Sequence, residues 1–300
     1  MKKLLIALMA ISLCGFFCMA SAHEPPGETL FAVQFPDSNV PMIDGNDSDW
    51  TAVTLDVYGI FSEDLFSIHG FAGDNVGRGE LDASSMQIRH LIGWNDSANH
   101  LYITSRVFDN MHTVNRQDPG KFFWDDAVEY EVSPTHQALD TQNAGEEANG
   151  FSYKFAFPPL ENTFEWYRPN RNLPWMTSGS QWLETDFSFT GEEFGESTYT
   201  YEMRILPIEK MPKSEEATEN QVEIHDLTEG GIIHMTLTVG DVDESAGDAD
   251  HRVGMWSTNP IQCCWAGQDV LLTPNDPGID WGATPTAVEN STWGQIKAQF

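Results

Sequence analysis

The chain has 300 residues, of which 46 are acidic and 15 are basic, so its formal net charge at pH 7 is −31. So acidic a protein repels nucleic acids and anionic membranes and disfavours acidic polysaccharides, whereas it suits neutral ligands and divalent cations. Solubility outside the cell would also explain most of the charge. The length allows one sizeable sandwich or two small domains.

The first 22 residues have the layout of a secretory signal peptide. Lys2 and Lys3 precede an apolar run, and the small residues 20–22 form a cleavage site. The apolar run is shorter than the roughly 20 residues that a membrane span needs, and no later segment is long and apolar enough to span. We therefore expect cleavage near Ala22 and a mature chain, 23–300, that is periplasmic, secreted or on the cell surface.

The sequence offers few cysteines for stabilising such an exported fold. Once the signal peptide is removed, only Cys263 and Cys264 remain, and they are adjacent. Without a disulfide framework, the fold must depend on an apolar core. The pair could be two thiols, a link to another chain or a vicinal disulfide, although neighbouring Cα atoms, about 3.8 Å apart, are closer than in most disulfides.

Short segments of alternating apolar and polar residues, separated by polar turns, predict strands along most of the chain. Two apolar runs flank the turn-forming residues 95–99, which indicates a hairpin. One short helical turn is expected near Asp47. Many strands without a strand–helix rhythm predict an all-β fold, an antiparallel β-sandwich of jelly-roll or immunoglobulin-like architecture. The further strands are expected in the segments 125–134, 150–159, 197–208, 231–243, 252–257 and 291–300.

Four segments between these strands are expected to be long loops, namely 59–85, 158–184, 207–230 and 258–291. Loops of this length are usually functional or disordered, and the tryptophans in two of them argue against disorder. No internal repeat or linker divides the mature chain. We therefore expect one domain with insertions.

The segment "FFWDDAVEYEV", residues 122–132, combines aromatic and acidic residues in a strand pattern. Because side chains alternate between the two faces of a strand, Val128 and Tyr130 share one face, and Glu129 and Glu131 share the other. The first face can pack on a core. The carboxylates on the second face either lie in water or line a groove, and Asp126 would support a local turn or a cation.

Tryptophans are frequent in the predicted loops. An exposed indole ring offers a flat apolar face on which a pyranose can stack, while nearby carboxylates and amides bind its hydroxyl groups. The alternative is that these rings anchor loops to the body of the protein, which would account for most of them. Those in loops are Trp166, Trp175, Trp182, Trp265 and Trp281, and Trp124 lies at a strand entrance.

The acidic segment "GDVDESAGDADHR" is a candidate calcium site. Its oxygen ligands would be Asp241, Asp243, Asp248 and Asp250, since calcium is a hard cation that binds oxygen. The spacing does not match an EF-hand, and a solvated hairpin tip is an equal alternative.

Haem is the rival cofactor, because histidines and methionines could serve as its axial ligands. No spacing selects a pair of them, and the Cys-x-x-Cys-His motif is absent. The candidates are Met111, His112, His136, His234, Met235 and Met255.

The sequence carries no positive sign of catalysis. It lacks the Gly-x-Ser-x-Gly and His-Glu-x-x-His motifs and a phosphate-binding glycine loop. Carboxylates are so numerous that a glycosidase-like pair proves nothing. We expect that the protein is not an enzyme.

Several segments, taken in order, resemble the family 9 carbohydrate-binding modules, which belong to the DOMON-like group of β-sandwiches. The resemblance runs from about Met42 to the end of the chain, and the four long loops depart from the shorter family pattern. The matching segments are "PMIDGNDSDWTAV", "IGWNDSANHLYITSRVFDN", "FFWDDAVEYEVSP", "YTYEMRILP", "LTVGDVDESAGDADHRVGMWS" and "STWGQIKA".

This resemblance implies a sugar held between two tryptophans, a glutamate and a basic residue that bind its hydroxyl groups, and calcium that stabilises the fold. The first tryptophan would be Trp124, the glutamate Glu129 and the basic residue Lys154. The second tryptophan would be Trp265 or Trp281, of which Trp265 is favoured. The adjacent cysteines would then lie beside the second tryptophan.

The function implied is non-catalytic binding of a neutral glycan or oligosaccharide outside the cytoplasm, in support of polysaccharide breakdown by separate enzymes. Two alternatives stay open. One is a haem-binding electron-transfer domain, which DOMON-like sandwiches also include. The other is a structural or adhesion module whose sugar site has decayed.

Overall fold

The computed structural model of the chain describes residues 23–68, 75–80, 82–141, 150–157, 165–168, 173–243, 253–261 and 265–282. The predicted signal peptide and the predicted last strand, 291–300, lie outside these residues. None of the helices in the described ranges is long and apolar enough to cross a membrane. The expected helical turn near Asp47 is present as a 3₁₀ turn, Asp47–Trp50.

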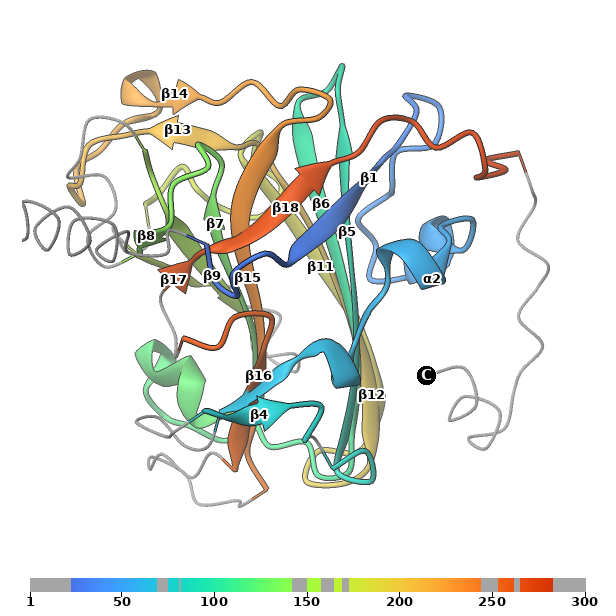
Figure 1. Ribbon diagram of the computed structural model, residues 1–300. Coiled ribbons are helices and arrows are strands. Elements are labelled where there is room, and N and C mark those ends of the chain that lie inside the picture. Colours follow the sequence, from blue (N-terminus) through green and yellow to red (C-terminus); the bar gives the residue numbers. More distant parts are fainter. Residues whose placement is uncertain are drawn as a thin grey trace, which may run out of the picture.

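Strands make up most of the described structure (Figure 1). They are β1 (Thr29–Gln34), β2 (Ile60–Phe61), β3 (Phe66–Ile68), β4 (Asn75–Arg78), β5 (Met86–Asn95), β6 (His100–Asp109), β7 (Ala127–Ser133), β8 (Leu139–Asp140), β9 (Tyr153–Phe157), β10 (Glu165–Arg168), β11 (Leu183–Gly191), β12 (Ser197–Ile205), β13 (Ile208–Lys210), β14 (Glu223–Ile224), β15 (Ile232–Asp241), β16 (Gly254–Ser257), β17 (Trp265–Ala266) and β18 (Gln268–Leu272). The helical elements are η1 (Asp47–Trp50), α2 (Leu55–Tyr58), η2 (Ser62–Asp64), η3 (Pro119–Trp124) and η5 (Glu219–Gln221).

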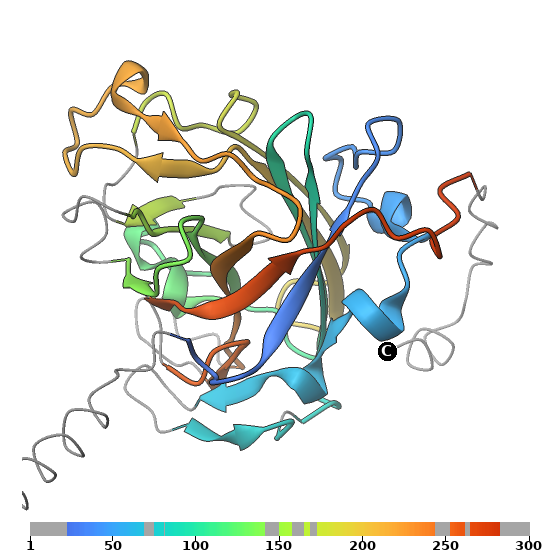
Figure 2. The same ribbon diagram turned by 45° about the horizontal axis from the view of Figure 1, so that its top comes forward.

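The main sheet has the strand order β10-β9-β7-β15-β18-β1-β5-β6-β12-β11. Figure 1 shows β5, β6, β11 and β12 as one layer and β7, β9 and β15 opposite them, with β18 and β1 crossing between the two; Figure 2 gives a second view. The all-β prediction is therefore confirmed, as two β-layers around the main core. The antiparallel prediction holds along this path except at β1, which pairs in parallel with both β18 and β5.

The core lies between the two layers and contains one face of β7. Val128, Tyr130 and Val132 are fully buried in it, together with Tyr199 and Met203 of β12. The predicted core face of the segment 122–132 is thus confirmed. The register of β7 is fixed by this burial, because a shift of one residue would bring its glutamates into the core.

One buried carboxylate, that of Glu202 on β12, fastens the turn around η1 to the sheet. It accepts hydrogen bonds from Trp50 Nε1 and from the backbone nitrogens of Asp44 and Asn46, each over 3.1 Å. Burial raises the pKa of Glu202 to about 7. The folded protein therefore holds a proton here at a pH where the unfolded chain has released it.

This carboxyl group predicts a pH dependence of stability. Between its ordinary pKa of 4.5 and its folded pKa of about 7, the folded state binds more protons than the unfolded state. The free energy of unfolding should therefore fall as pH rises through this window, by up to about 1.4 kcal/mol per pH unit. Glu202→Gln should reduce that slope, as measured by urea unfolding at pH 5, 6 and 7. An unchanged slope in Glu202→Gln would contradict the assignment.

Candidate functional site

A row of polar side chains covers the face of β7 that points away from the core. Lys154 of β9 lies opposite Glu131, and on the other side Thr236 and Thr238 of β15 lie opposite Glu131 and Glu129. We call these five residues the polar layer. Since they come from three neighbouring strands at matched register, their side chains share one face of the sheet.

The charged residues of the polar layer are bound to one another. Lys154 Nζ lies 3.0 Å from Glu131 Oε1 and also contacts Glu129 Oε2. Lys154 is 2% exposed and Glu129 4%, so the carboxylates are neither free in water nor open at the surface. Removing charges from water costs several kcal/mol for each ion, and this arrangement offsets that cost by pairing two carboxylates with one ammonium group.

Trp124 lies in the turn whose Phe122 contacts the polar layer. It ends η3, and in the same turn the ring of Phe122 lies 5.8 Å from Lys154 Nζ. The indole of Trp124 is partly exposed, with Lys121 Nζ 5.1 Å from its centre. The packing of Phe122 against Ala127 and Ala156 fixes η3 over the sheet. A partly exposed aromatic ring is thereby held in the turn that leads into β7, five residues before Glu129.

Trp265 stands at the border of the polar layer. Its strand, β17, contacts both β7 and β15, and its carbonyl oxygen accepts a hydrogen bond from Thr236 Oγ1 over 2.5 Å. The indole lies so close to Gly267 that a Cβ there would be 2.2 Å from Nε1. The ring is partly exposed, whereas Nε1 itself is buried against Gly267 and has no hydrogen-bond partner within the described structure.

Trp281 is not brought to the polar layer. Its ring packs on Phe35, with 5.0 Å between ring centres, beside a separate core cluster that includes Val33 and Trp50. The structure therefore brings the backbone of Trp265 and the turn that carries Trp124 to the polar layer, and it places Trp281 elsewhere. Cys263 and Cys264 lie outside the described residues.

The predicted metal ligands Asp241 and Asp243 lie beside Asp109, at the end of β6. One carboxylate oxygen of each falls within 4.8 Å of the others, and we call these three residues the carboxylate cluster. Burial, with Asp109 and Asp243 adding to it, raises the pKa of Asp241 to about 8. Sequence reasoning missed Asp109 because it is the last residue of β6, more than 130 positions before Asp241. Asp248 and Asp250 lie outside the described residues.

Two further residues border the carboxylate cluster. His112 Nδ1 lies 3.6 Å from Asp109 Oδ2 and 3.5 Å from Asp126 Oδ2. Asp126 also accepts hydrogen bonds from the backbone nitrogens of Val242, over 2.7 Å, and of Thr113. Burial raises its pKa, and the charges of Asp109 and Asp241 add to the rise. Asp126 thus supports the local turns, as expected from the sequence.

The chemistry of the carboxylate cluster fits a hard cation. Both carboxylate oxygens of Asp241 and Asp109 Oδ2 are buried, and they lack hydrogen-bond partners in the described part of the chain. Unpaired buried oxygens of like charge repel one another, and calcium binds such oxygens through six to eight ligands. Part of the predicted ligand set can therefore hold this ion.

The residues considered as haem ligands are scattered among different environments. Met235 and Met255 are buried, and His112 faces the carboxylates. His136 and His234 are neighbours, with 4.6 Å between their ring centres.

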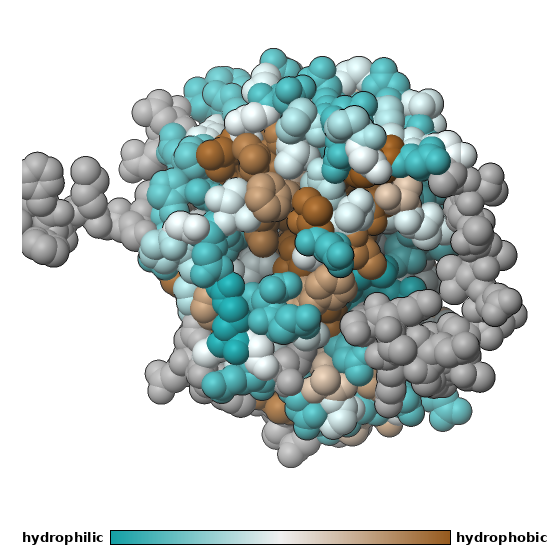
Figure 3. All heavy atoms as spheres, turned by 45° about the vertical axis from the view of Figure 1, so that its right-hand side comes forward, coloured by the Kyte–Doolittle hydropathy of each residue, from teal (hydrophilic) through white to brown (hydrophobic). Residues whose placement is uncertain are grey.

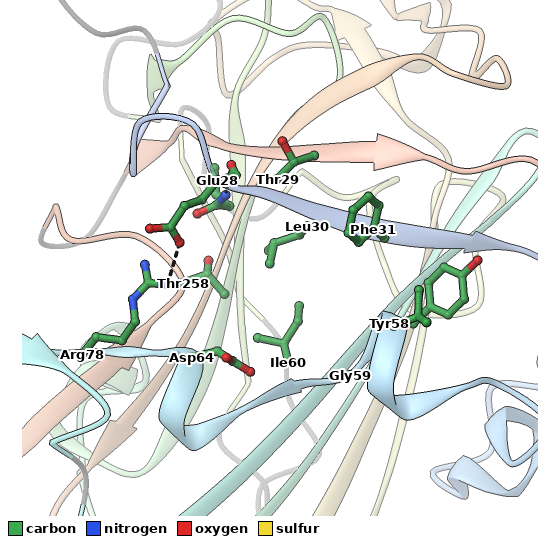
Figure 4. A pocket seen from close by; sticks show the side chains of 12 residues that line it. Glu28, Thr29, Leu30, Phe31, Tyr58, Gly59, Ile60, Asp64, Arg78 and Thr258 are labelled. Atoms are coloured by element: carbon green, nitrogen blue, oxygen red, sulfur yellow. Dashed lines mark hydrogen bonds and ion pairs between the residues drawn. The ribbon is translucent and has the colours of Figure 1, made fainter.

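A groove of about 210 Å³ lies between β1 and β2 (Figure 4). Leu30, Phe31 and Ile60 give it an apolar lining, and an ion pair of 2.5 Å between Arg78 and Glu28 closes one end. Phe31 is 38% exposed. Figure 3 brings the right-hand side of Figure 1 forward. On this face, hydrophobic residues gather among hydrophilic ones. Sequence reasoning did not single out this groove.

Comparison with solved structures finds family 9 carbohydrate-binding modules from Caldicellulosiruptor kristjanssonii. The module in complex with cellotriose is 14% identical, with a TM-score of 0.46 over 83% of this chain and 96% of that one. The module in complex with glucose is 14% identical, with a TM-score of 0.47 over 84% and 100%. Likenesses of this level say nothing about what the present chain binds. No protein-family model matches the chain, and no curated protein matches it.

Proposed function

We propose that the protein binds a neutral carbohydrate without catalysing its conversion, at the polar layer between Trp124 and Trp265. One observation carries this proposal. Two partly exposed indole rings lie on segments beside a buried set of carboxylate, ammonium and hydroxyl groups. Flat apolar rings combined with a few placed polar groups are what a pyranose requires, because its ring faces are apolar and its edge carries hydroxyl groups.

Each part of this site has a chemical role in the proposal. The indoles of Trp124 and Trp265 stack on the sugar. The resemblance to family 9 modules implies that Glu129 accepts hydrogen bonds from sugar hydroxyls and that Lys154 donates to them. Because these residues are 4% and 2% exposed, side chains at the polar layer must move before a sugar can reach them. The contact between Glu129 and Lys154 holds both side chains in one geometry before a ligand arrives. Less conformational entropy is then lost on binding.

The proposal extends to calcium and to location. The carboxylate cluster would bind calcium, which would join the end of β6 to the end of β15 and neutralise the repulsion around Asp241. The signal peptide expected from the sequence would bring the protein outside the cytoplasm, where it would support polysaccharide breakdown by separate enzymes. The strongly acidic composition supports a neutral rather than an acidic glycan.

A binding panel tests this function. The purified protein, with calcium present, is applied to immobilised neutral oligosaccharides and to acidic oligosaccharides of the same length. Retention on one or more neutral glycans, and none on their acidic counterparts, is the expected result. A folded, colourless protein that binds no glycan would contradict the proposal, and a strong Soret absorption band would favour haem binding.

The groove between β1 and β2 is the main rival location on the described surface. Phe31→Ala removes its exposed ring without touching the polar layer. If the proposal is right, this variant keeps the glycan affinity of the unaltered protein. Loss of glycan binding in Phe31→Ala would instead place the sugar in the groove.

A further inference from the structure

Four metal-ligating side chains from distant parts of the chain meet at one edge of the polar layer. His234 of β15 and Asp269 of β18 are direct partners across the two strands. His136 comes from the turn after β7, and His23 comes from the segment before β1. We call these four residues the histidine cluster. Their ligand atoms all lie within 4.8 Å of one another.

The distances within the histidine cluster are close to those of a tetrahedral metal site. Asp269 Oδ1 lies 2.7 Å from His23 Nδ1, 2.8 Å from His234 Nε2 and 3.5 Å from His136 Nε2. His234 Nε2 lies 3.3 Å from His23 Nδ1. Zinc bonds of roughly 2.0–2.1 Å at tetrahedral angles place ligand atoms about 3.3 Å apart. A single ion can therefore contact all four atoms after small side-chain movements.

Hydrogen bonding to the carboxylate does not account for the whole cluster. One carboxylate oxygen has about two lone pairs to offer, yet three imidazole nitrogens lie within 3.5 Å of Asp269 Oδ1. The three rings are also in mutual contact, with centres 4.6 to 5.2 Å apart. A cation among these nitrogens explains why they converge on the same point.

The backbone holds two of these ligands in place. His136 has a φ of +54°, a left-handed conformation that few residues other than glycine adopt. The segment that carries His23 is fastened by a hydrogen bond of 3.0 Å from Glu24 N to Gly267 O, two residues before Asp269. Both features bring partly exposed histidines toward the buried ring of His234.

We propose that the histidine cluster binds one Zn²⁺ ion through His23, His136, His234 and Asp269. Three imidazoles and one carboxylate in a tetrahedron are typical ligands of zinc, whereas the oxygen-only carboxylate cluster suits calcium. The ion joins four segments that are far apart in sequence, including the segment before β1. This site is separate from the proposed sugar contacts, and its test uses zinc alone.

Calorimetric titration of the chelator-treated, whole mature protein with Zn²⁺ tests the site. Millimolar calcium is present so that the carboxylate cluster is occupied. We expect one zinc ion per chain with a dissociation constant below 1 μM, and X-ray absorption should report nitrogen and oxygen neighbours at about 2.0 Å. His234→Ala and His136→Ala should each weaken binding at least tenfold. His136 is exposed, so the second variant keeps the test valid if the first does not fold.

His225→Ala is the matched control. His225 also contacts a carboxylate, with Nδ1 3.2 Å from Glu209 Oε2, but it lies outside the cluster. This variant should bind zinc as the unaltered protein does. Absence of zinc binding in the unaltered protein would overturn the proposal, and so would unchanged binding in His136→Ala.

Discussion

Replacement of Lys154 by methionine should lower the free energy of unfolding by about 3–5 kcal/mol. Lys154 is almost fully buried and is ion-paired with both Glu129 and Glu131. Methionine has a similar length but no charge, so Lys154→Met would leave two carboxylates buried side by side without this counter-charge. Urea unfolding of Lys154→Met and of the unaltered protein, under the same buffer and calcium concentration, measures the difference.

Two controls separate the loss of charge pairing from the loss of a lysine. Lys210 pairs with Glu223 over 2.9 Å at a position where the two side chains are 45% and 60% exposed, and Lys210→Met should cost less than about 1 kcal/mol. The triple variant Glu129→Gln, Glu131→Gln, Lys154→Met should recover much of the stability lost in Lys154→Met. Equal losses in the two lysine variants would contradict the account of the polar layer.

Removal of calcium should have the second large effect. At a free calcium concentration of 100 times the dissociation constant, binding adds about 2.7 kcal/mol to the free energy of unfolding. Chelation should then lower the melting temperature by roughly 4–5 °C for a chain of this length. Differential scanning calorimetry at pH 8, with 1 mM calcium or with excess chelator, measures the shift.

Asp241→Asn should change the melting temperature in opposite directions with and without calcium. Asparagine cannot add to the repulsion within the carboxylate cluster, so the metal-free variant should melt above the metal-free unaltered protein at pH 8. With calcium, the variant should melt below the unaltered protein, because it has lost a charged ligand. The matched control is Asp96→Asn, in the exposed turn between β5 and β6, which should change neither value. A calcium shift that Asp241→Asn leaves intact would place the ion elsewhere.

The sequence predicts the strands whose side chains alternate over their full length. The hairpin of β5 and β6, and the strands β7, β12 and β15, are where the pattern places them, because their apolar residues must face one core. Short strands carry too few residues for such a pattern. Segment 258–291 was expected to be a loop, but it contains β17 and the five-residue β18. β18 is recognisable only through its pairing with β15 and with β1.

The candidate site was predictable only in part, because a local pattern shows which face a side chain takes but not which distant residue it meets. Alternation places Glu129 away from the core, but it cannot show that Lys154, on another strand, neutralises it. The histidine cluster depends on contacts between residues up to 246 positions apart. No local spacing indicates them, which is why His136 and His234 were considered only as unrelated candidate haem ligands and His23 only as the expected start of the mature chain.

Calorimetric titration with a neutral oligosaccharide, in the unaltered protein and in two tryptophan variants, tests the central claim most directly. Trp265→Ala removes a ring at the border of the polar layer, whereas Trp281→Ala removes one that packs on Phe35. Loss of one stacking partner worth about 1.4 kcal/mol would weaken binding tenfold. We predict at least that loss in Trp265→Ala and unchanged affinity in Trp281→Ala, with both variants folded. Equal affinities in all three proteins, or a loss confined to Trp281→Ala, would contradict a sugar site at the polar layer.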